Sequence, residues 1–227
     1  AAHAMLSDAD RNRIAQRNER LQTASLAWVK SVEKAATDNA ATTPIDPLWA
    51  SYRVGQMLDD NCIVLDETLP GPRTRDYLDR SVPGSYFANP GSSGGWAPGA
   101  ALGAKLAAPD KVAINFMGDA AIGMVGMDIE TAVREEIPIL TVVLKNSAMG
   151  NYEKHIPISV EKYGTKFLTG HYADLARSLG AHGERIEQPG DIRAAFERGI
   201  AANRDGQPAL LEFITREEPD MAIPPRG

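Results

Sequence analysis

The stretch that most restricts the fold of this 227-residue chain lies at residues 111–150. An apolar run at residues 112–117 stops at Gly118 and Asp119, as a buried strand does when it ends in a tight turn. A second apolar run occupies residues 139–144. Between the runs, apolar residues recur at the spacing of one helix that packs on a sheet by one face. These residues are Ile122, Val125, Ile129, Ala132 and Val133. The stretch therefore predicts a strand, a helix and a second strand parallel to the first.

Two polar side chains follow the predicted strands. Asp119 and Asn146 come directly after the two apolar runs, so both lie at the carboxyl edge of the sheet, where open α/β sheets bind ligands. The small side chains of Ala120 and Ala121 leave the backbone amides at the helix start uncovered for an anionic group. Mg²⁺ prefers oxygen ligands and takes much of its shell from water and phosphate. The pattern predicts a site for a hard cation that carries phosphate.

The same stretch resembles the signature of thiamine diphosphate-dependent enzymes, which usually begins with GDG and ends with NN. Here Gly-Asp-Ala at residues 118–120 is followed, after about two dozen residues, by Lys-Asn at residues 145–146. The preceding motifs at residues 83–86, 91–95 and 99–104 resemble those of benzoylformate decarboxylase and acetolactate synthase-like enzymes. The resemblance implies the diphosphate-binding domain of this family, with thiamine diphosphate and Mg²⁺ as cofactors.

The resemblance also implies roles for individual residues. It places the metal ligands at Asp119, Asn146 and the backbone carbonyl of Ala148. The other implied cofactor contacts are Thr68, Ser92, Gly94, Gly118, Ala120, Ala121, Met149 and Gly150. Thr68 is equally well explained as a cap of the segment that follows it. No catalytic residue is identified, because the family's activating glutamate belongs to a separate pyrimidine-binding domain.

Three residues depart from the family pattern. Ala120 replaces the usual third glycine, Lys145 replaces the first asparagine, and Gly94 stands where a bulky apolar residue normally supports the bent cofactor. We expect either that Trp96 or Met149 fills the space beside Gly94 or that the cofactor is held less firmly. Metal binding is expected to persist, since the ligand position itself remains asparagine.

The leading hypothesis is therefore the diphosphate-binding half of an enzyme that acts on 2-oxo acids or acyl donors by decarboxylation or carboligation. Its expected partner is a chain or segment with the pyrimidine-binding domain, in a dimer or tetramer. Glu130, Glu135 and Glu136 do not match the activating glutamate. A non-catalytic, regulatory subunit is the alternative, which the three departures motivate. A dinucleotide-binding module is disfavoured, because the G-x-G-x-x-G spacing is missing after the strand.

Charge and composition narrow the partners and the compartment. The net charge of −6 argues against nucleic acid or an anionic membrane as the main partner. The sequence shows neither an apolar run of membrane-helix length nor a signal-peptide core. One cysteine, Cys62, fits a reducing compartment, so we expect a cytoplasmic protein in which this thiol is a small buried side chain.

The order of predicted elements gives the architecture. Strands at residues 62–65, 183–186 and 208–215 add to the two already described, and helices alternate with them. The expected fold is α/β, with a doubly wound, mainly parallel sheet over residues 44–218 and helices on both faces. A helical segment at residues 1–43 precedes it and a tail at residues 219–227 follows it.

Three further elements complete this picture. In the N-terminal segment, Ser7 with Asp10 three residues later resembles the capped start of a helix. This segment carries a narrow apolar stripe and is expected to dock on the main domain or on a partner chain. A helix is predicted over residues 48–58. Residues 157–170 are expected to form a loop that covers the site.

Overall fold

The computed structural model of the chain describes residues 6–68, 77–78, 80–89, 93–150 and 152–217. Six parallel strands form one sheet in the order β2-β1-β3-β4-β6-β5. The strands are β1 (Cys62–Asp66), β2 (Tyr86–Ala88), β3 (Val112–Gly118), β4 (Ile139–Lys145), β5 (His182–Ile186) and β6 (Ala209–Ile214). The predicted doubly wound α/β fold is confirmed, and every pairing of these strands is parallel.

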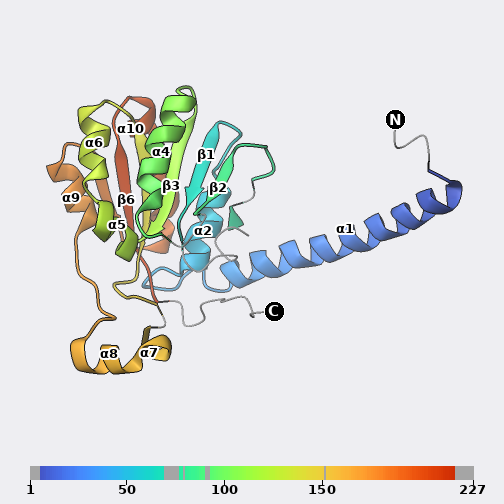
Figure 1. Cartoon of the computed structure of the whole chain (residues 1–227), viewed down its shortest axis with the longest axis horizontal. Coiled ribbons are helices and arrows are strands. Elements are labelled where there is room, and N and C mark those ends of the chain that lie inside the picture. Colours follow the sequence, from blue (N-terminus) through green and yellow to red (C-terminus); the bar gives the residue numbers. More distant parts are fainter. Residues whose placement is uncertain (1–5, 69–76, 79, 90–92, 151, 218–227) are drawn as a thin grey trace.

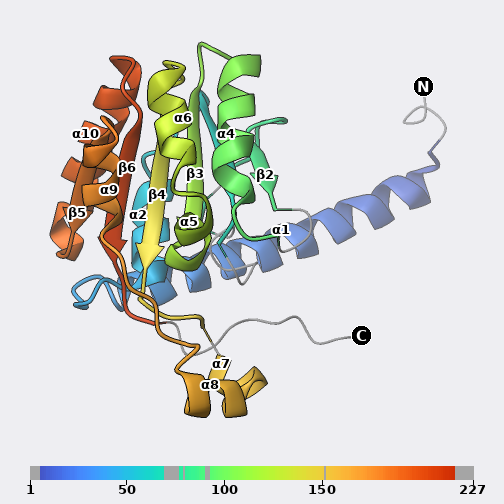
Figure 2. The same ribbon diagram turned by 60° about the vertical axis from the view of Figure 1, so that its left-hand side comes forward.

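Helices cover both faces of this sheet (Figures 1 and 2). On one face, α2 (Pro47–Gly55) and α10 (Ile192–Arg204) pack on a core that includes Phe116, Phe196 and Phe213. On the other face lie α4 (Trp96–Ala107), α5 (Asp119–Val125), α6 (Asp128–Arg134) and α9 (Tyr172–Ser178). A short 3-10 helix, η2 (Pro189–Asp191), precedes α10. The central strands β3 and β4 are buried from both sides, which explains their continuous apolar sequence.

The predicted continuous helix between β3 and β4 was wrong, because α5 and α6 are separate helices. The chain interrupts the helix between Val125 and Asp128. A Cβ atom added at Gly126 would lie 2.9 Å from Leu175 Cδ2, so α9 packs directly against the interruption. Gly123 and Gly126 also weaken a continuous helix through their backbone freedom. The apolar spacing alone does not contain this information.

The predicted loop over residues 157–170 was also wrong in part. It contains α8 (Pro157–Tyr163), which follows the short helix α7 (Tyr152–His155). Pro157 occupies the first turn of α8, and Gly164 ends it in the left-handed conformation with φ of 62°. Figure 2 shows α7 and α8 beyond the end of the sheet toward which β4 points. The predicted helix over residues 48–58 is shorter than expected, since α2 ends at Gly55.

The long N-terminal helix α1 (Asp8–Thr37) begins at a capping box of Ser7 and Asp10, as the sequence indicates. Figure 1 shows this helix projecting away from the sheet domain. Its apolar residues Leu21, Trp28 and Val29 are 60%, 57% and 55% exposed. The expected docking of this stripe on the main domain was therefore wrong. Among the described helices, α1 included, none has both the length and the apolar character needed to cross a membrane.

Within the described residues, the C-terminal part of α1 packs against the domain. Glu33 Oε1 accepts a hydrogen bond of 3.0 Å from Tyr52 Oη of α2, and Ala36 is fully buried. A groove of about 700 Å³ runs between this part of α1 and the domain, with Trp28 and Tyr77 in its lining. Docking on a partner chain stays a prediction for the exposed stripe.

Gly183 of β5 packs closely against the helix α9. An added Cβ would lie 2.2 Å from the backbone oxygen of Ala173 in α9 and 3.0 Å from Arg177 Cγ. Gly183→Ala is expected to lower the free energy of unfolding by about 3 kcal/mol, because β5 and α9 must move apart. Gly103→Ala is the control: it is exposed in α4, nothing lies within 4 Å of an added Cβ, and stability should rise by about 0.5–1 kcal/mol. Urea unfolding measures both, and equal stabilities of the two variants would contradict this packing.

Cys62 is the buried first residue of β1, as predicted. Burial raises the pKa of its thiol from the ordinary 9.0 to about 11. In the unfolded chain the thiol ionises near pH 9, so unfolding releases a proton between about pH 9 and pH 11. Stability should therefore fall as the pH rises through this window, more steeply in the wild type than in Cys62→Ala. Unfolding at a series of pH values tests this, and equal slopes for the two proteins would contradict it.

Candidate functional site

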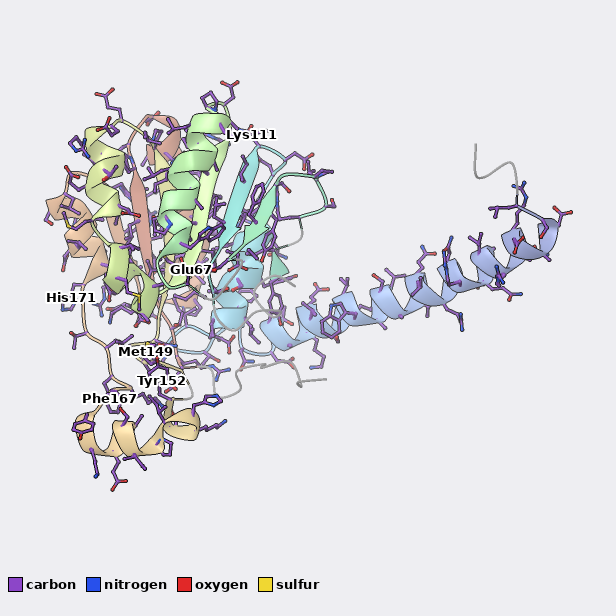
Figure 3. All side chains as sticks on the ribbon, in the orientation of Figure 1. Glu67, Lys111, Met149, Tyr152, Phe167 and His171 are labelled. Carbon is purple, nitrogen blue, oxygen red and sulfur yellow. The ribbon has the colours of Figure 1, made fainter. Side chains whose placement is uncertain are left out.

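The ends of three adjacent strands define the candidate site. β1, β3 and β4 lie side by side and parallel, so Glu67, Asp119 and Asn146 all leave the sheet at its carboxyl edge. From β1 the chain continues to β2 on one side of the sheet, and from β3 it continues to β4 on the other side. The order in which strands are added therefore reverses between β1 and β3. Such a switch point is where open α/β sheets bind ligands. Figure 3 shows Lys111 at the opposite end of the domain from Met149.

Asp119 is the buried acid of this site, with 3% of its surface exposed. Its Oδ2 accepts a hydrogen bond of 2.7 Å from the Ser147 amide, and its Oδ1 accepts one of 3.1 Å from the Ala120 amide. Burial raises the pKa of this carboxyl, while the two backbone hydrogen bonds and the charge of Lys145 act in the opposite direction. The bond to Ser147 connects the end of β3 to the loop after β4, so the two halves of the predicted motif meet.

The loop after β4 is held in a defined shape. Asn146 Oδ1 accepts a hydrogen bond of 2.9 Å from the Ala148 amide, and Ser147 has a φ of 59°. The left-handed conformation at Ser147 turns the chain sharply between the two predicted ligand positions. Asn146, Ala148 and Asp119 are thus brought together by the loop that the sequence motif indicates.

A segment from beyond α8 pairs with this loop. Ala148 and Phe167 form an antiparallel bridge, in which the Met149 amide donates to the Lys166 oxygen at 2.7 Å. The Leu168 amide donates to the Ser147 oxygen at 3.0 Å. The site therefore includes a short paired segment that the sequence analysis treated as a loop. The paired stretch is too short to show the alternation of apolar and polar residues that predicts a strand.

Tyr172 supports the site from α9. Its hydroxyl donates to the backbone oxygen of Asp119 at 3.1 Å and lies 3.3 Å from the oxygen of Thr169. The pKa of this hydroxyl is raised, first by burial and then by the charges of Asp119 and Glu212. The tyrosine thus fixes the start of α5 without using the Asp119 carboxylate.

Glu67 is a site residue whose role the sequence analysis missed. This buried carboxylate accepts hydrogen bonds from the Gly95 amide at 2.5 Å and the Ala97 amide at 2.7 Å. It therefore caps α4 from another part of the chain. It also holds the end of the glycine loop, whose described residues are Ser93, Gly94 and Gly95. Gly95 has a φ of 90°, which requires glycine at this position. An acid directly after a buried strand was the available signal.

The glycine loop contains one described departure from the family pattern, Gly94. A Cβ added there would lie 2.8 Å from Met124 Sδ. The expected neighbours, Trp96 and Met149, are not among the atoms within 4 Å of that position, and their support of the bent cofactor stays a prediction. Met124 comes from α5, which packs over the glycine loop. Ser92, the other predicted contact here, lies outside the described residues.

Ala120 fits the helix start without backbone strain. Among the described residues other than glycine, positive φ angles occur at Glu136 and Ser147. Ala120 consequently has the negative φ that alanine adopts freely. Gly118 is the N-cap of α5 and supplies no side-chain cap, while Ala121 is buried. The replacement of the usual third glycine therefore does not distort this turn.

Thr68 lies at the end of β1, but its hydroxyl is engaged within its own turn. The Oγ1 atom donates to Asp66 Oδ1 at 2.6 Å, and the Thr68 amide donates to the same oxygen at 2.9 Å. Tyr86 Oη donates to the other carboxylate oxygen at 2.7 Å. The cap interpretation accounts for these bonds, and contact with a cofactor stays a prediction. Met149 and Gly150 are half-buried in the loop after β4.

The donors of the site suit a hard cation. Within the described ranges, the structure has no group of three or more histidine, cysteine, aspartate or glutamate side chains arranged to hold a metal ion. The candidate donors are instead the carboxylate of Asp119, the carboxamide of Asn146 and the carbonyl of Ala148. The bond between Asp119 and the Ser147 amide brings them to one place. Magnesium needs few protein ligands, so these residues fit it when phosphate completes the shell.

The fold and the site define a doubly wound α/β ligand-binding domain with polar groups gathered at its switch point. The chain matches the thiamine pyrophosphate enzyme, C-terminal TPP binding domain family over residues 73–213. The protein therefore belongs to the thiamine pyrophosphate enzyme family, and the resemblance seen in its motifs is confirmed. Thiamine pyrophosphate is another name for thiamine diphosphate.

Individual relatives agree with this assignment. The chain is 31% identical over 189 residues to the acetolactate synthase large subunit of Mycobacterium tuberculosis, covering 81% of this chain and 34% of that protein. It is 37% identical over 150 residues to sulfoacetaldehyde acetyltransferase of Alcaligenes xylosoxydans, covering 63% and 24%. The chain thus spans about a quarter to a third of the length of these curated relatives.

A solved structure shows the same architecture. The thiamine diphosphate-dependent 4-hydroxybenzoylformate decarboxylase of Rhodococcus jostii RHA1 superposes with a TM-score of 0.67 at 25% identity. The superposition covers 78% of this chain and 33% of that structure. The domain described here therefore corresponds to one part of a larger enzyme architecture.

Proposed function

We propose that this chain is the diphosphate- and magnesium-binding half of a thiamine diphosphate-dependent enzyme that acts on 2-oxo acids or acyl donors. The observation that carries the proposal is the hydrogen bond of 2.7 Å between Asp119 Oδ2 and the Ser147 amide. It joins the two halves of the motif at the switch point of the sheet. The relatives named above include a synthase, an acetyltransferase and a decarboxylase, which supports carboligation or decarboxylation as the reaction class.

The residues of the site divide into two groups by what they hold. Asp119, Asn146 and the Ala148 carbonyl would bind Mg²⁺. The remaining candidate cofactor contacts are Thr68, Ser92, Gly94, Gly118, Ala120, Ala121, Met149 and Gly150. When bound, the cofactor supplies a nucleophilic thiazolium carbon for attack on a carbonyl and a ring that accepts the resulting electron pair. The chain itself would orient the diphosphate, and the buried setting of Asp119 and its bond to the Ser147 amide hold this carboxylate in place.

The activating glutamate is proposed to come from a pyrimidine-binding domain in another chain or segment. Glu67 does not suit this role, because both of its carboxylate oxygens bind backbone amides. Glu130 and Glu135 bind Arg134 at the surface of the domain. A complete active site would then form where the two domains meet, in a dimer or tetramer.

A non-catalytic subunit of such an enzyme is the second candidate function. It is favoured by Gly94, whose neighbouring space holds Met124, and by the charge that Lys145 adds to the site. The unstrained backbone at Ala120 counts against it. A partner with its own complete diphosphate motif would support this alternative. A partner with a pyrimidine-binding domain alone would support the catalytic proposal.

Reconstitution tests the choice between these functions. The chain is copurified with its partner, and carbon dioxide release from a 2-oxo acid is measured with thiamine diphosphate and Mg²⁺. The proposal predicts turnover by the complex that Asp119→Ala abolishes. Turnover by this chain without a second polypeptide would contradict the divided active site. Turnover that persists in a complex containing Asp119→Ala would favour the non-catalytic role.

A further inference from the structure

Lys145 places a buried positive charge inside the candidate site. It is the last residue of β4, and only 8% of its surface is exposed. Its Nζ donates to Ser147 Oγ at 2.9 Å, and the amide of the same serine binds Asp119 Oδ2 at 2.7 Å. The ammonium group therefore lies in the loop that carries the predicted metal ligands.

The hydrogen bonding of Lys145 is incomplete. An ammonium group has three N–H donors, and lysine is seldom buried unless it is paired with an anion. In the described part of the chain, Ser147 Oγ is the partner of Nζ, and no carboxylate forms an ion pair with it. Its charge nevertheless reaches Asp119, whose pKa it lowers against the larger effect of burial. The remaining donors can serve an anion bound beside Asp119.

We propose that the Lys145 ammonium binds the cofactor's diphosphate directly, so that the site holds a diphosphate even without a divalent cation. The inference rests on the proposed function. Lysine binds phosphate as a compact point charge, whereas the asparagine usual at this position carries no charge. The Ser147 hydroxyl accepts from Lys145 and keeps its own proton for a second bond to the phosphate. Magnesium then strengthens binding through Asp119 and Asn146 but is not the source of all the positive charge.

Calorimetric titration of the full chain with inorganic pyrophosphate tests this proposal, once in EDTA and once with Mg²⁺. Pyrophosphate contains the group in question and needs no pyrimidine-binding domain. Lys145→Met removes the charge at similar length, Lys145→Arg keeps the charge, and Lys162→Met removes an exposed lysine on α8 as a control. In EDTA we expect wild-type binding, an affinity lower by about tenfold or more in Lys145→Met, and near-wild-type affinity in Lys145→Arg and Lys162→Met. With Mg²⁺ the loss in Lys145→Met should be smaller.

The contrary outcomes separate the inference from the function on which it rests. Equal affinities of wild type and Lys145→Met in EDTA would overturn the role of the lysine. Wild-type binding that requires Mg²⁺ would overturn it too, while leaving the proposed function intact. If the wild type binds pyrophosphate in neither buffer, the proposed function fails together with the inference. Circular dichroism and thermal unfolding confirm that each variant is folded, and Lys145→Arg shows the effect of charge if Lys145→Met is destabilised.

Discussion

Asp119→Ala is expected to weaken binding of thiamine diphosphate in the presence of Mg²⁺ by about a hundredfold or more. The substitution removes the carboxylate that we propose as a ligand of Mg²⁺. It also removes the hydrogen bond of 2.7 Å from the Ser147 amide to Asp119 Oδ2. In the wild type this bond holds the loop that contains Asn146. Both losses would act on the proposed metal site, so the effect should exceed that of changing a residue that merely orients a ligand. Calorimetric titration with the cofactor measures it.

Asp110→Ala is the matched control for this prediction. Asp110 is exposed and precedes β3, at the opposite end of the strand from Asp119. Its removal changes the net charge by the same amount and should leave the affinity unchanged. Full cofactor affinity of Asp119→Ala with Mg²⁺ would contradict the assigned metal site.

Glu67→Gln is expected to lower the free energy of unfolding by about 2–3 kcal/mol. The buried carboxylate accepts from two backbone amides, those of Gly95 and Ala97. Glutamine offers one acceptor oxygen and would turn its own N–H₂ group toward the second amide, leaving two buried donors facing each other. The start of α4 and the glycine loop would lose their anchor to β1. Urea unfolding followed by circular dichroism gives the change in stability.

The control for Glu67→Gln is the same substitution at an exposed position. Glu187 pairs with Arg185 at the surface, where ion pairs contribute little. Glu187→Gln should therefore change the free energy of unfolding by less than about 0.5 kcal/mol. Equal effects at the two positions would show that Glu67 does not anchor the glycine loop. Weaker cofactor binding in Glu67→Gln, with the fold retained, would connect this anchor to the site.

Much of the fold could be predicted from the sequence, because its strong signals are local. The apolar runs of β3 and β4 are too long and too continuous to be anything but buried, and the position of Asp119 and Asn146 after them follows from parallel pairing. Ser7 and Asp10 gave the start of α1 for the same reason, since a capping box depends on residues three apart. These features need no knowledge of distant parts of the chain.

The rest depends on contacts between segments far apart in the sequence. The interruption between α5 and α6 reflects the packing of Leu175 against Gly126, which periodicity cannot reveal. Glu67 acts on amides of Gly95 and Ala97, some thirty residues away. The exposed stripe of α1 was expected to be covered because its apolar spacing is helical. That spacing predicts a face of a helix and does not specify what covers it.

We propose that this chain recognises the diphosphate of the cofactor. This proposal is tested most directly by equilibrium titration of the chain with thiamine diphosphate and, separately, with thiamine, both in the presence of Mg²⁺. In the proposed site, Asp119, the Asn146 loop and the start of α5 would hold the diphosphate and its metal. This site predicts one-to-one binding of thiamine diphosphate and an affinity for thiamine lower by about a hundredfold or more, because thiamine lacks the group that the metal and the loop would hold. Equal binding of the two compounds, or binding of neither, would contradict the proposal.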